Sequence, residues 1–283
     1  MALGKFFILG IGAQKCGTTW LEAQLTKTPF FSNGGIKEFH VFNKIHSGRG
    51  AIDKKLRRRH KKGQENLLNT REIMRLSPRF YFDHFDYLYY RDENISHVGD
   101  ITPAYSILNR QKLESIKSGI ESKKFQIKLV FLMRDPVERV WSHLRMRNRL
   151  LNERKNKPRR SAQEEYKQLS QFYKTASCKK RTSYEKTAAT IESVFSKKCI
   201  YYGFYENLFQ KTEIKQLADF LECPSINPDF SNVLHASPKP SEQVDGMEDL
   251  LLEIRKYYNN TYLWAQNRFQ DKVPALWKIN DRA

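Results

Sequence analysis

The chain has 283 residues, of which 40% are hydrophobic and 13% aromatic, and this is enough apolar material for a sizeable core. Fifty Lys and Arg residues against 31 Asp and Glu give a net charge of +19. This excess excludes no single function, but it favours anionic partners: nucleotides, sulfated or phosphorylated substrates, nucleic acid or acidic lipid. We expect a single domain over residues 1–283.

The N-terminus lacks the pattern of a signal peptide, and no run approaches the roughly 20 apolar residues that a membrane helix needs. Four cysteines lie at positions 16, 178, 199 and 223, with no pair at C-x-x-C spacing. A disulfide framework and a metal site are therefore not indicated. These features predict a protein without a membrane span, with reduced thiols, in the cytoplasm.

Short apolar strands alternate with helical patterns along the chain. We predict strands at 5–9, 97–99, 127–133 and 199–204, and helices at 19–25, 109–120, 137–151, 162–174, 184–195 and 213–221. Widely spaced buried strands with helices between them are typical of an α/β fold. The prediction is a P-loop-type domain with a central parallel sheet flanked by helices. Such sheets bind ligands at the carboxyl ends of their strands.

Two basic helical insertions are predicted, near 46–80 and 145–180. The first contains the run Lys54–Lys62, and the second contains eight Lys and Arg residues between Arg145 and Arg160. Each is either a solvated, mobile insertion or a patch for nucleic acid or membrane. A third alternative is that both line the rim of the cleft and hold an anionic acceptor.

A glycine-rich turn follows the first strand, over Gly12-Ala-Gln-Lys-Cys-Gly-Thr-Thr. A strand, such a turn and a helix N-terminus together present backbone N–H groups to an anion. Lys15 adds a positive charge, and Thr18 and Thr19 add hydroxyl donors. The common phosphate loop places its lysine after the second glycine and binds magnesium. Here Lys15 precedes Gly17, so the pattern predicts a phosphate site with no need for a metal.

Two plainer interpretations of this turn exist. Its glycines can be purely conformational. Cys16 is better explained as a small residue in a tight turn than as a nucleophile.

A second anion site is predicted after the strand at 127–133. Asp135 suits an N-cap and Pro136 the first helical position, so Arg134 leaves the end of a buried strand. Ser142 follows two helical turns later. An arginine fork with a hydroxyl suits a phosphate monoester. Alternatively, Arg134 pairs with Asp135 or Glu138 as a structural salt bridge.

Two anion sites on one sheet indicate a ligand with phosphate at both ends. A nucleotide with 5′ and 3′ phosphates meets that need, whereas ATP does not.

The chain resembles the sulfotransferases that use 3′-phosphoadenosine 5′-phosphosulfate (PAPS). Four of its segments are similar to family elements, in family order: Gly12-Ala-Gln-Lys-Cys-Gly-Thr-Thr-Trp-Leu, Arg134-Asp-Pro-Val-Glu-Arg-Val-Trp-Ser-His, Arg181-Thr-Ser-Tyr and Tyr205-Glu-Asn-Leu. Among the branches, the pattern is closest to the glycosaminoglycan (heparan sulfate)-type carbohydrate sulfotransferases. The resemblance implies PAPS as the donor, no metal, and Lys15 stabilising the charge on the leaving phosphate. The implied nucleotide contacts are Lys15, Cys16, Gly17, Thr18, Thr19, Trp20, Arg134, Ser142, Tyr184 and Lys239.

The base is carried over from Lys37-Glu-Phe-His-Val-Phe, which resembles the Glu-x-His-x-Phe stretch of the glycosaminoglycan enzymes. The resemblance implies that Glu38 deprotonates the acceptor hydroxyl, for which a raised pKa is expected. His40 assists, or is itself the base as in the small-molecule branch. Asp100-Ile-Thr-Pro-Ala-Tyr resembles a third element, with Ile101 where many glycosaminoglycan enzymes have a lysine, and Asp100 is a candidate for the acceptor site.

The predicted function is sulfuryl transfer to a hydroxyl of a carbohydrate or other small molecule, with an anionic or saccharide acceptor favoured by the basic insertions. The aromatic clusters at 80–82 and 87–90 either line an apolar acceptor pocket or pack the core. One alternative is a P-loop kinase that uses ATP. A second is a basic nucleic-acid-binding protein, although no motif of the known modules is present and no nucleic-acid partner is expected.

Overall fold

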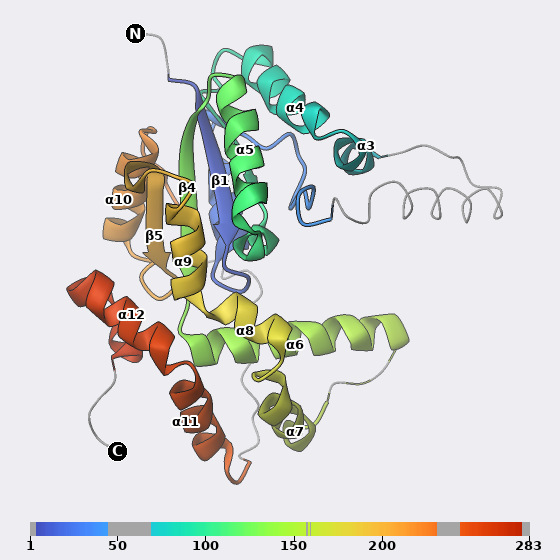
Figure 1. The fold of residues 1–283 in the computed structure, drawn as a ribbon, viewed down its shortest axis with the longest axis vertical. Helices are drawn as coiled ribbons and strands as arrows, with labels where there is room; N and C mark the ends of the chain where they lie inside the picture. Colours follow the sequence, from blue (N-terminus) through green and yellow to red (C-terminus); the bar gives the residue numbers. More distant parts are fainter. Residues whose placement is uncertain (1–3, 45–68, 157, 159, 231–243, 279–283) are drawn as a thin grey trace, which may run out of the picture.

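The computed structural model describes residues 4–44, 69–156, 158, 160–230 and 244–278. Its centre is a parallel sheet of five strands in the order β2–β3–β1–β4–β5 (Figure 1). The strands are β1 (Phe6–Gly12), β2 (Phe31–Ser32), β3 (His97–Ile101), β4 (Gln126–Met133) and β5 (Ile200–Phe204). The central strand β1 is buried along its whole length, as expected for a parallel sheet covered on both faces. The predicted fold class is confirmed.

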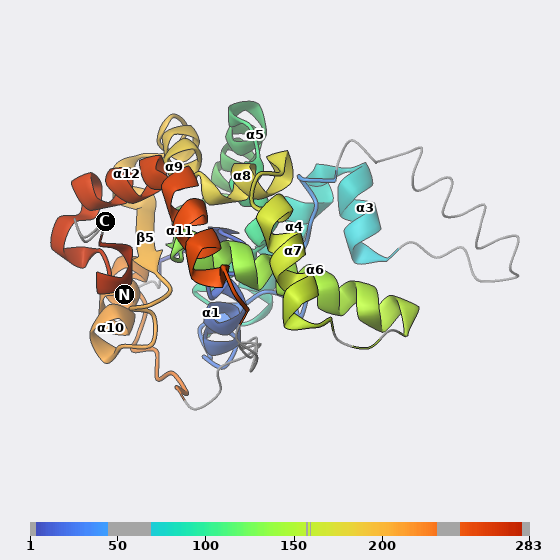
Figure 2. The ribbon, with the colours of Figure 1, turned by 90° about the horizontal axis from the view of Figure 1, so that it is seen from below.

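Helices cover both faces of the sheet. Figures 1 and 2 show α5 (Arg110–Ser122) and α9 (Tyr184–Glu192) on one face, and α1 (Thr18–Leu25) and α10 (Lys211–Leu221) on the other. The remaining helices are α3 (Thr70–Leu76), α4 (Pro78–Arg91), α6 (Pro136–Lys155), α7 (Ala162–Phe172), α8 (Ala176–Thr182), α11 (Met247–Tyr257) and α12 (Asn259–Phe269).

Neighbouring residues of β1 pack into opposite layers. Phe7 contacts Phe85 of α4, with ring centroids 4.8 Å apart. Phe6 stacks on His97 at 4.7 Å, and His97 Nε2 lies 2.8 Å from the carbonyl oxygen of Leu221, the last residue of α10. This alternation is the period of two that a strand imposes on its side chains.

The carboxyl ends of the strands face a separate group of helices. In Figure 1, α6 runs across the sheet below β1 and β4, with α7, α8 and α11 beside it. Asp135 is the N-cap of α6, where its carboxylate accepts a hydrogen bond of 3.0 Å from the backbone N–H of Glu138. Pro136 takes the first helical position. The predicted start of this helix is confirmed, although α6 continues four residues past the predicted end.

The segments that were not predicted as elements are mostly short. β2 has two residues, and α3 and α8 have seven each. The aromatic clusters form α4, whose buried residues Tyr81, Phe82, Phe85 and Leu88 pack the core. Phe80, Tyr87 and Tyr90 are exposed, so only part of each cluster packs the core as expected. Within the described ranges, no helix has the length and apolar character needed to cross a bilayer. The basic run Lys54–Lys62 and Lys239 lie outside the described residues.

Candidate functional site

The glycine-rich loop joins β1 to α1 at the carboxyl edge of the sheet. Gly17 is the N-cap of α1 and has a φ of 88°, and Lys15 has a φ of 74°. Thr18 and Thr19 begin the helix, so their backbone N–H groups lie in its first turn, where they have no intrahelical partner. The sequence prediction of a strand, a turn and a helix N-terminus is confirmed, and this is the geometry that favours anions.

Cys16 points away from solvent. Its Sγ is fully buried and lies 3.7 Å from the hydroxyl of Tyr184. Burial raises the pKa of the Cys16 thiol to about 12. The thiol is therefore protonated and unreactive at neutral pH, which agrees with its interpretation as a small residue in a tight turn.

The loop packs directly on the segment that follows β5. A Cβ built on Gly17 would lie 2.7 Å from Leu208 Cδ2 and 3.0 Å from Tyr205 Cδ2, too close for any side chain. The guanidinium of Arg134 lies over the ring of the same Tyr205, 4.5 Å from its centroid. Tyr205 therefore links the two predicted anion sites.

Three cations converge on the loop. Burial lowers the pKa of Lys15 below its usual value, and the positive charges of Arg149 and Arg134 lower it further. Glu38 acts in the opposite direction. Within the described part of the chain, the Lys15 ammonium forms no hydrogen bond or ion pair of its own. A half-buried lysine repelled by two arginines defines a place where an anion would be stabilised.

The segment after β4 is fixed by several buried contacts. Tyr184 donates a hydrogen bond of 2.8 Å to the carbonyl oxygen of Arg134. Glu206 accepts one of 2.8 Å from the backbone N–H of Asp135, and Tyr262 of α12 donates one of 2.7 Å to the Asp135 carboxylate. The predicted contact residue Tyr184 thus holds the backbone next to Arg134, and its hydroxyl is already engaged.

Arg134 also has the ion-pair partner that the sequence suggested. Its Nη2 lies 3.0 Å from Glu138 Oε2, and its side chain is 18% exposed. Ser142 lies two turns along α6 and is buried. Arg149 is seven residues further on, so it shares a face of the helix with Ser142. Arg149, from the second basic segment, also acts on the charge of Lys15. Whether the basic segments hold an anionic acceptor stays a prediction.

Glu38 and His40 lie side by side. Glu38 Oε2 is 3.0 Å from His40 Nε2, and Asn43 Nδ2 is 3.2 Å from His40 Nδ1. The pKa of Glu38 is lowered, mainly by the hydrogen bond with His40, which outweighs burial. The expectation of a raised pKa is therefore wrong, because it took account of burial without the imidazole next to the carboxylate.

Asp100, expected as a candidate for the acceptor site, is fully buried. Its carboxylate accepts hydrogen bonds of 2.9 Å from Tyr81 and 2.5 Å from Thr102. Ile101 is buried next to Gly10 of β1. Neither side chain is exposed to an acceptor, so the acceptor-site expectation for Asp100 is wrong.

Trp20 is buried in α1 with an aromatic partner that was not predicted. Its indole lies nearly parallel to the ring of Phe230, with centroids 6.0 Å apart. The indole Nε1 is buried and has no hydrogen-bond partner among the described residues. Sequence reasoning missed Phe230, Arg149 and Asn43. Helical spacing from Ser142 was the available signal for Arg149, whereas nothing in the sequence marked Phe230.

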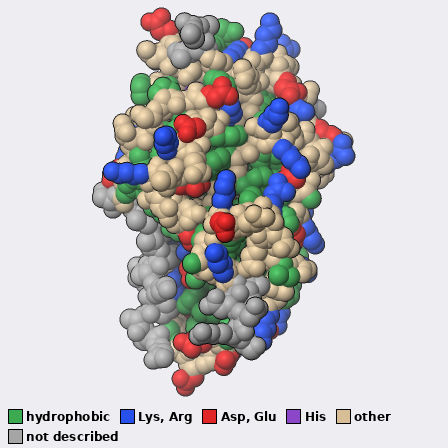
Figure 3. Space-filling view, turned by 90° about the vertical axis from the view of Figure 1, so that its left-hand side faces the viewer, with side chains coloured by type: hydrophobic (Ala, Val, Ile, Leu, Met, Phe, Trp, Pro, Cys, Tyr) green, Lys and Arg blue, Asp and Glu red, His purple; other side chains and the backbone are tan. Residues whose placement is uncertain are grey.

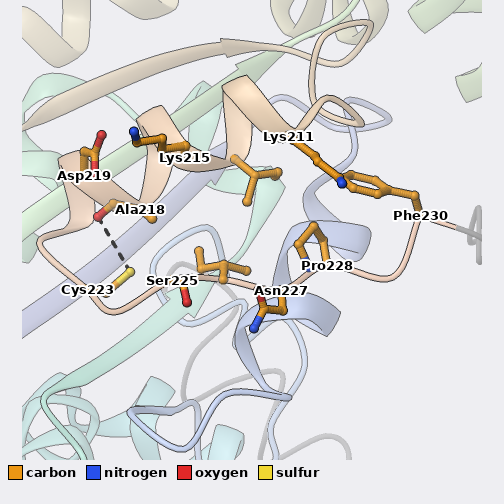
Figure 4. Close-up of a pocket in the computed structure, with 11 residues that line it drawn as sticks. Lys211, Lys215, Ala218, Asp219, Cys223, Ser225, Asn227, Pro228 and Phe230 are labelled. Carbon is orange, nitrogen blue, oxygen red and sulfur yellow. Dashed lines mark hydrogen bonds between the residues drawn. The ribbon is translucent and has the colours of Figure 1, made fainter.

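A separate surface pocket of about 590 Å³ lies beside α10. Figure 4 shows Lys211 and Lys215 of the helix on one side, and Asn227 and Pro228 of the following segment on the other. Its lining reaches Phe230 but includes none of the predicted site residues.

The family model of the sulfotransferase domain matches residues 5–245. The chain belongs to the sulfotransferase family. Sulfuryl transfer is therefore its general activity. The two C-terminal helices of this sulfotransferase, α11 and α12, lie beyond the matched residues.

One solved structure supports the fold of this family, and two more distant ones are similar over part of the comparison. A sulfotransferase from Alicyclobacillus acidocaldarius is 17% identical, with a TM-score of 0.58 over 98% of this chain and 99% of that chain. The sulfotransferase domain of the curacin biosynthetic pathway is 17% identical, with a TM-score of 0.43 over 78% and 74%. That of the Synechococcus PCC 7002 olefin synthase is 14% identical, with a TM-score of 0.44 over 90% and 94%. No curated protein shows significant sequence similarity to this sulfotransferase.

Proposed function

We propose that the chain transfers a sulfuryl group from PAPS to a hydroxyl of an acceptor. The observation that carries this proposal is the loop between β1 and α1, in which Lys15 and Gly17 have positive φ angles and α1 begins at Thr18. The first backbone N–H groups of a helix favour an anion there. Burial and the positive charges of Arg149 and Arg134 lower the pKa of Lys15, and a bound anion would oppose that effect. No group of three or more His, Cys, Asp or Glu residues suited to a metal occurs in the described ranges.

The residues present fit such a donor. Lys15, Thr18, Thr19 and the backbone N–H groups of the loop would hold its 5′ end. Arg134 and Ser142 would hold a 3′-phosphate, which competes with Glu138 for the guanidinium. Phe230, which stacks on the buried Trp20, would offer aromatic surface for the adenine of the nucleotide. Bound PAPS supplies the sulfuryl group and a phosphate leaving group.

Glu38 is the proposed base. It accepts the proton of the acceptor hydroxyl while the acceptor oxygen bonds to sulfur. Lys15 stabilises the negative charge on the bridging oxygen as the S–O bond to the leaving phosphate breaks. The lowered pKa keeps Glu38 ionised at neutral pH, so the carboxylate is ready to accept the proton, although it is a weaker base.

The acceptor proposal is a carbohydrate or another small hydroxyl compound. The pattern Glu38-Phe-His40 supports the glycosaminoglycan-type subclass. The burial of Ile101 limits that support, because this chain offers no cation at the position where those enzymes have one. Lys37 lies next to the base and is exposed, so it is the nearest candidate for contact with an anionic acceptor.

Thermal denaturation with two nucleotides tests the donor. 3′-Phosphoadenosine 5′-phosphate (PAP) without magnesium should raise the melting temperature, because it binds the folded state alone. ATP with magnesium should give a smaller shift. Stabilisation by ATP that depends on magnesium, with no response to PAP, would contradict the proposal. Labelled PAPS incubated with saccharides, phenols, lipids and peptides would then identify the acceptor.

The base is tested by Glu38→Gln. Turnover should fall roughly 10²- to 10⁴-fold, while the affinity for PAP stays the same, because Glu38 contributes no contact to the nucleotide. His40→Gln is the matched comparison and should have the smaller effect. Full activity of the Glu38 variant, or the larger loss in the His40 variant, would rule out Glu38 as the base.

A further inference from the structure

The segment Lys37–Phe42 contains two residues in a backbone conformation that is unfavourable for residues other than glycine. Glu38 has a φ of 50° and His40 a φ of 53°, both in the left-handed region. Residues other than glycine rarely adopt this conformation, because their Cβ lies too close to the following carbonyl oxygen. Two such residues, separated only by Phe39, persist only where contacts with the surrounding structure fix the backbone. The residues that make those contacts therefore control the position of the Glu38 carboxylate.

Arginines of α3 bind the carbonyl groups of the segment. Arg75 Nε donates a hydrogen bond of 3.1 Å to the carbonyl oxygen of His40, and its Nη2 donates one of 3.5 Å to that of Phe39. Arg71 donates a hydrogen bond to the carbonyl oxygen of Lys37. The contact of Arg71 is exposed, whereas those of Arg75 are partly buried.

A buried hydrogen-bond network around Asp100, at the carboxyl end of β3, also contacts the segment. We call Asp100, Thr102, Tyr81 and Tyr105 the Asp100 network. Tyr81 and Thr102 donate to the two carboxylate oxygens of Asp100, at 2.9 and 2.5 Å. The hydroxyl of Tyr105 accepts a hydrogen bond of 3.1 Å from the backbone N–H of Val41. The Asp100 network is thus hydrogen-bonded to the backbone of the segment at Val41.

Aromatic packing joins the network to the segment. The ring of Phe39 meets that of Tyr81 edge-on, with centroids 5.6 Å apart. Phe42 meets Tyr81 at 5.0 Å and Tyr105 at 5.8 Å. The two tyrosines therefore contact the residues that flank His40 in the segment.

We propose that Asp100 is a positioning residue, which fixes Tyr81, Tyr105 and the backbone of Lys37–Phe42 so that Glu38 and His40 face Lys15. This inference rests on the proposed function, in which Glu38 is the base. Asp100 acts through that segment and does not touch the acceptor, since it is fully buried.

The charge of Asp100 matters to this role. Burial raises its pKa to about 6, while hydrogen bonds from Thr102, Tyr81, Tyr105 and the backbone N–H of Phe39 oppose that rise. At neutral pH the carboxylate is thus mostly ionised and accepts hydrogen bonds only. An amide in its place would present two donors to hydroxyls that already donate.

Asp100→Asn tests the proposal with a readout that needs no catalysis. Hydrogen–deuterium exchange of the peptide that covers Lys37–Phe42 should become faster, because the amides of Phe39 and Val41 lose their fixed partners. Tyr105→Phe removes only the hydroxyl that binds Val41 and should act in the same direction. Tyr202→Phe is the matched control: it also deletes a tyrosine hydroxyl, bonded at 2.6 Å to Glu192, but on β5 away from the segment. Exchange of the peptide should not change there.

Kinetics then connect this movement to Glu38. The reaction measured is the cleavage of PAPS with water as the acceptor. Asp100→Asn should lower kcat about 10- to 100-fold, as expected for a displaced catalytic group, with the affinity for PAP unchanged. The double variant with Glu38→Gln should be no slower than Glu38→Gln alone, because both changes remove the same contribution.

The outcomes distinguish the positioning role of Asp100 from the role of Glu38 as the base. Faster exchange with a non-additive loss of kcat supports the positioning role. Unchanged exchange in both Asp100→Asn and Tyr105→Phe overturns it, as does a loss of kcat that multiplies with that of Glu38→Gln. Full activity of Glu38→Gln overturns the assignment of the base itself, and the positioning proposal with it.

Discussion

Lys15 is a residue whose surroundings oppose its charge. It adopts a left-handed backbone conformation, it is partly buried, and two arginines repel it. These features destabilise the ligand-free protein in the same place where they favour a bound anion. Such opposition between stability and function is common at active sites.

Lys15→Met should therefore separate the two effects. Without the repelled cation, the nucleotide-free protein should melt at a higher temperature than the original chain. PAP should bind ~10- to 100-fold more weakly, which corresponds to the loss of a charge-assisted hydrogen bond. Lys256→Met, which changes an exposed lysine of α11, should alter neither value. A variant that melts lower and still binds PAP normally would contradict this account.

The same residue predicts a pH dependence. The folded-state pKa of Lys15 lies below 10.5, so the ammonium loses its proton at a lower pH than an ordinary lysine. PAP affinity should fall as the pH rises through that lowered pKa, and calorimetry in the alkaline range would measure it. Lys15→Met lacks this titration, so its weak affinity should not show that decrease.

The residue types of the site were predictable, but their electrostatics were not. Lys15, Arg134 and Glu38 followed from spacing and from the resemblance, since a loop after a strand can be located from sequence. The direction of the Glu38 pKa shift could not be, because it depends on a 3.0 Å contact with His40 that both left-handed backbone conformations create. Arg149 was also missed as part of the site, although it belonged to a recognised basic run.

At the scale of secondary structure, the turn before α1 is shaped by its contact with the turn after β5. Gly17 has a positive φ and no room for a side chain, because Leu208 and Tyr205 lie against it. Tyr205 also stacks with Arg134. A shift in either turn would therefore change both predicted anion sites together.

Gly17→Ala should destabilise the protein and weaken PAP binding. The substitution combines backbone strain with a methyl group placed 2.7 Å from Leu208 Cδ2, and overpacking alone typically costs about 1–3 kcal/mol. Gly35→Ala is the control, since Gly35 also has a positive φ, of 72°, but open space around it. Denaturant unfolding should show a smaller loss there, with PAP binding intact. If both variants lost the same free energy of unfolding, backbone strain rather than the contact with Leu208 would account for the effect.

Four strands and six helices were predictable because each is apolar or amphipathic over enough residues to give a period. β2 has too few residues for any pattern. α4 also carries a helical signal, with apolar residues at 81, 82, 85 and 88. Its aromatic residues were interpreted as lining an acceptor pocket or packing the core, and no helix was predicted there. The two C-terminal helices, α11 and α12, were not predicted, and they meet at Tyr258.

At the scale of the whole molecule, the excess of positive charge is not spread evenly over the surface. Figure 3 shows Lys and Arg interspersed with Asp and Glu on the face that carries α10 and α12. By contrast, Arg134 and Arg149 both act on the charge of Lys15, in the loop after β1.

Tyr262 of α12 and Arg255 of α11 approach the same carboxylate oxygen of Asp135, at 2.7 and 3.9 Å. Asp135 caps α6 and follows Arg134, so both C-terminal helices support the second anion site, even though they lie beyond residue 245, where the family match ends. A fragment cut at that residue would retain all of the matched motifs and leave a buried carboxylate without its donor. A domain boundary drawn from the motifs alone would therefore cut the contacts of both helices with Asp135.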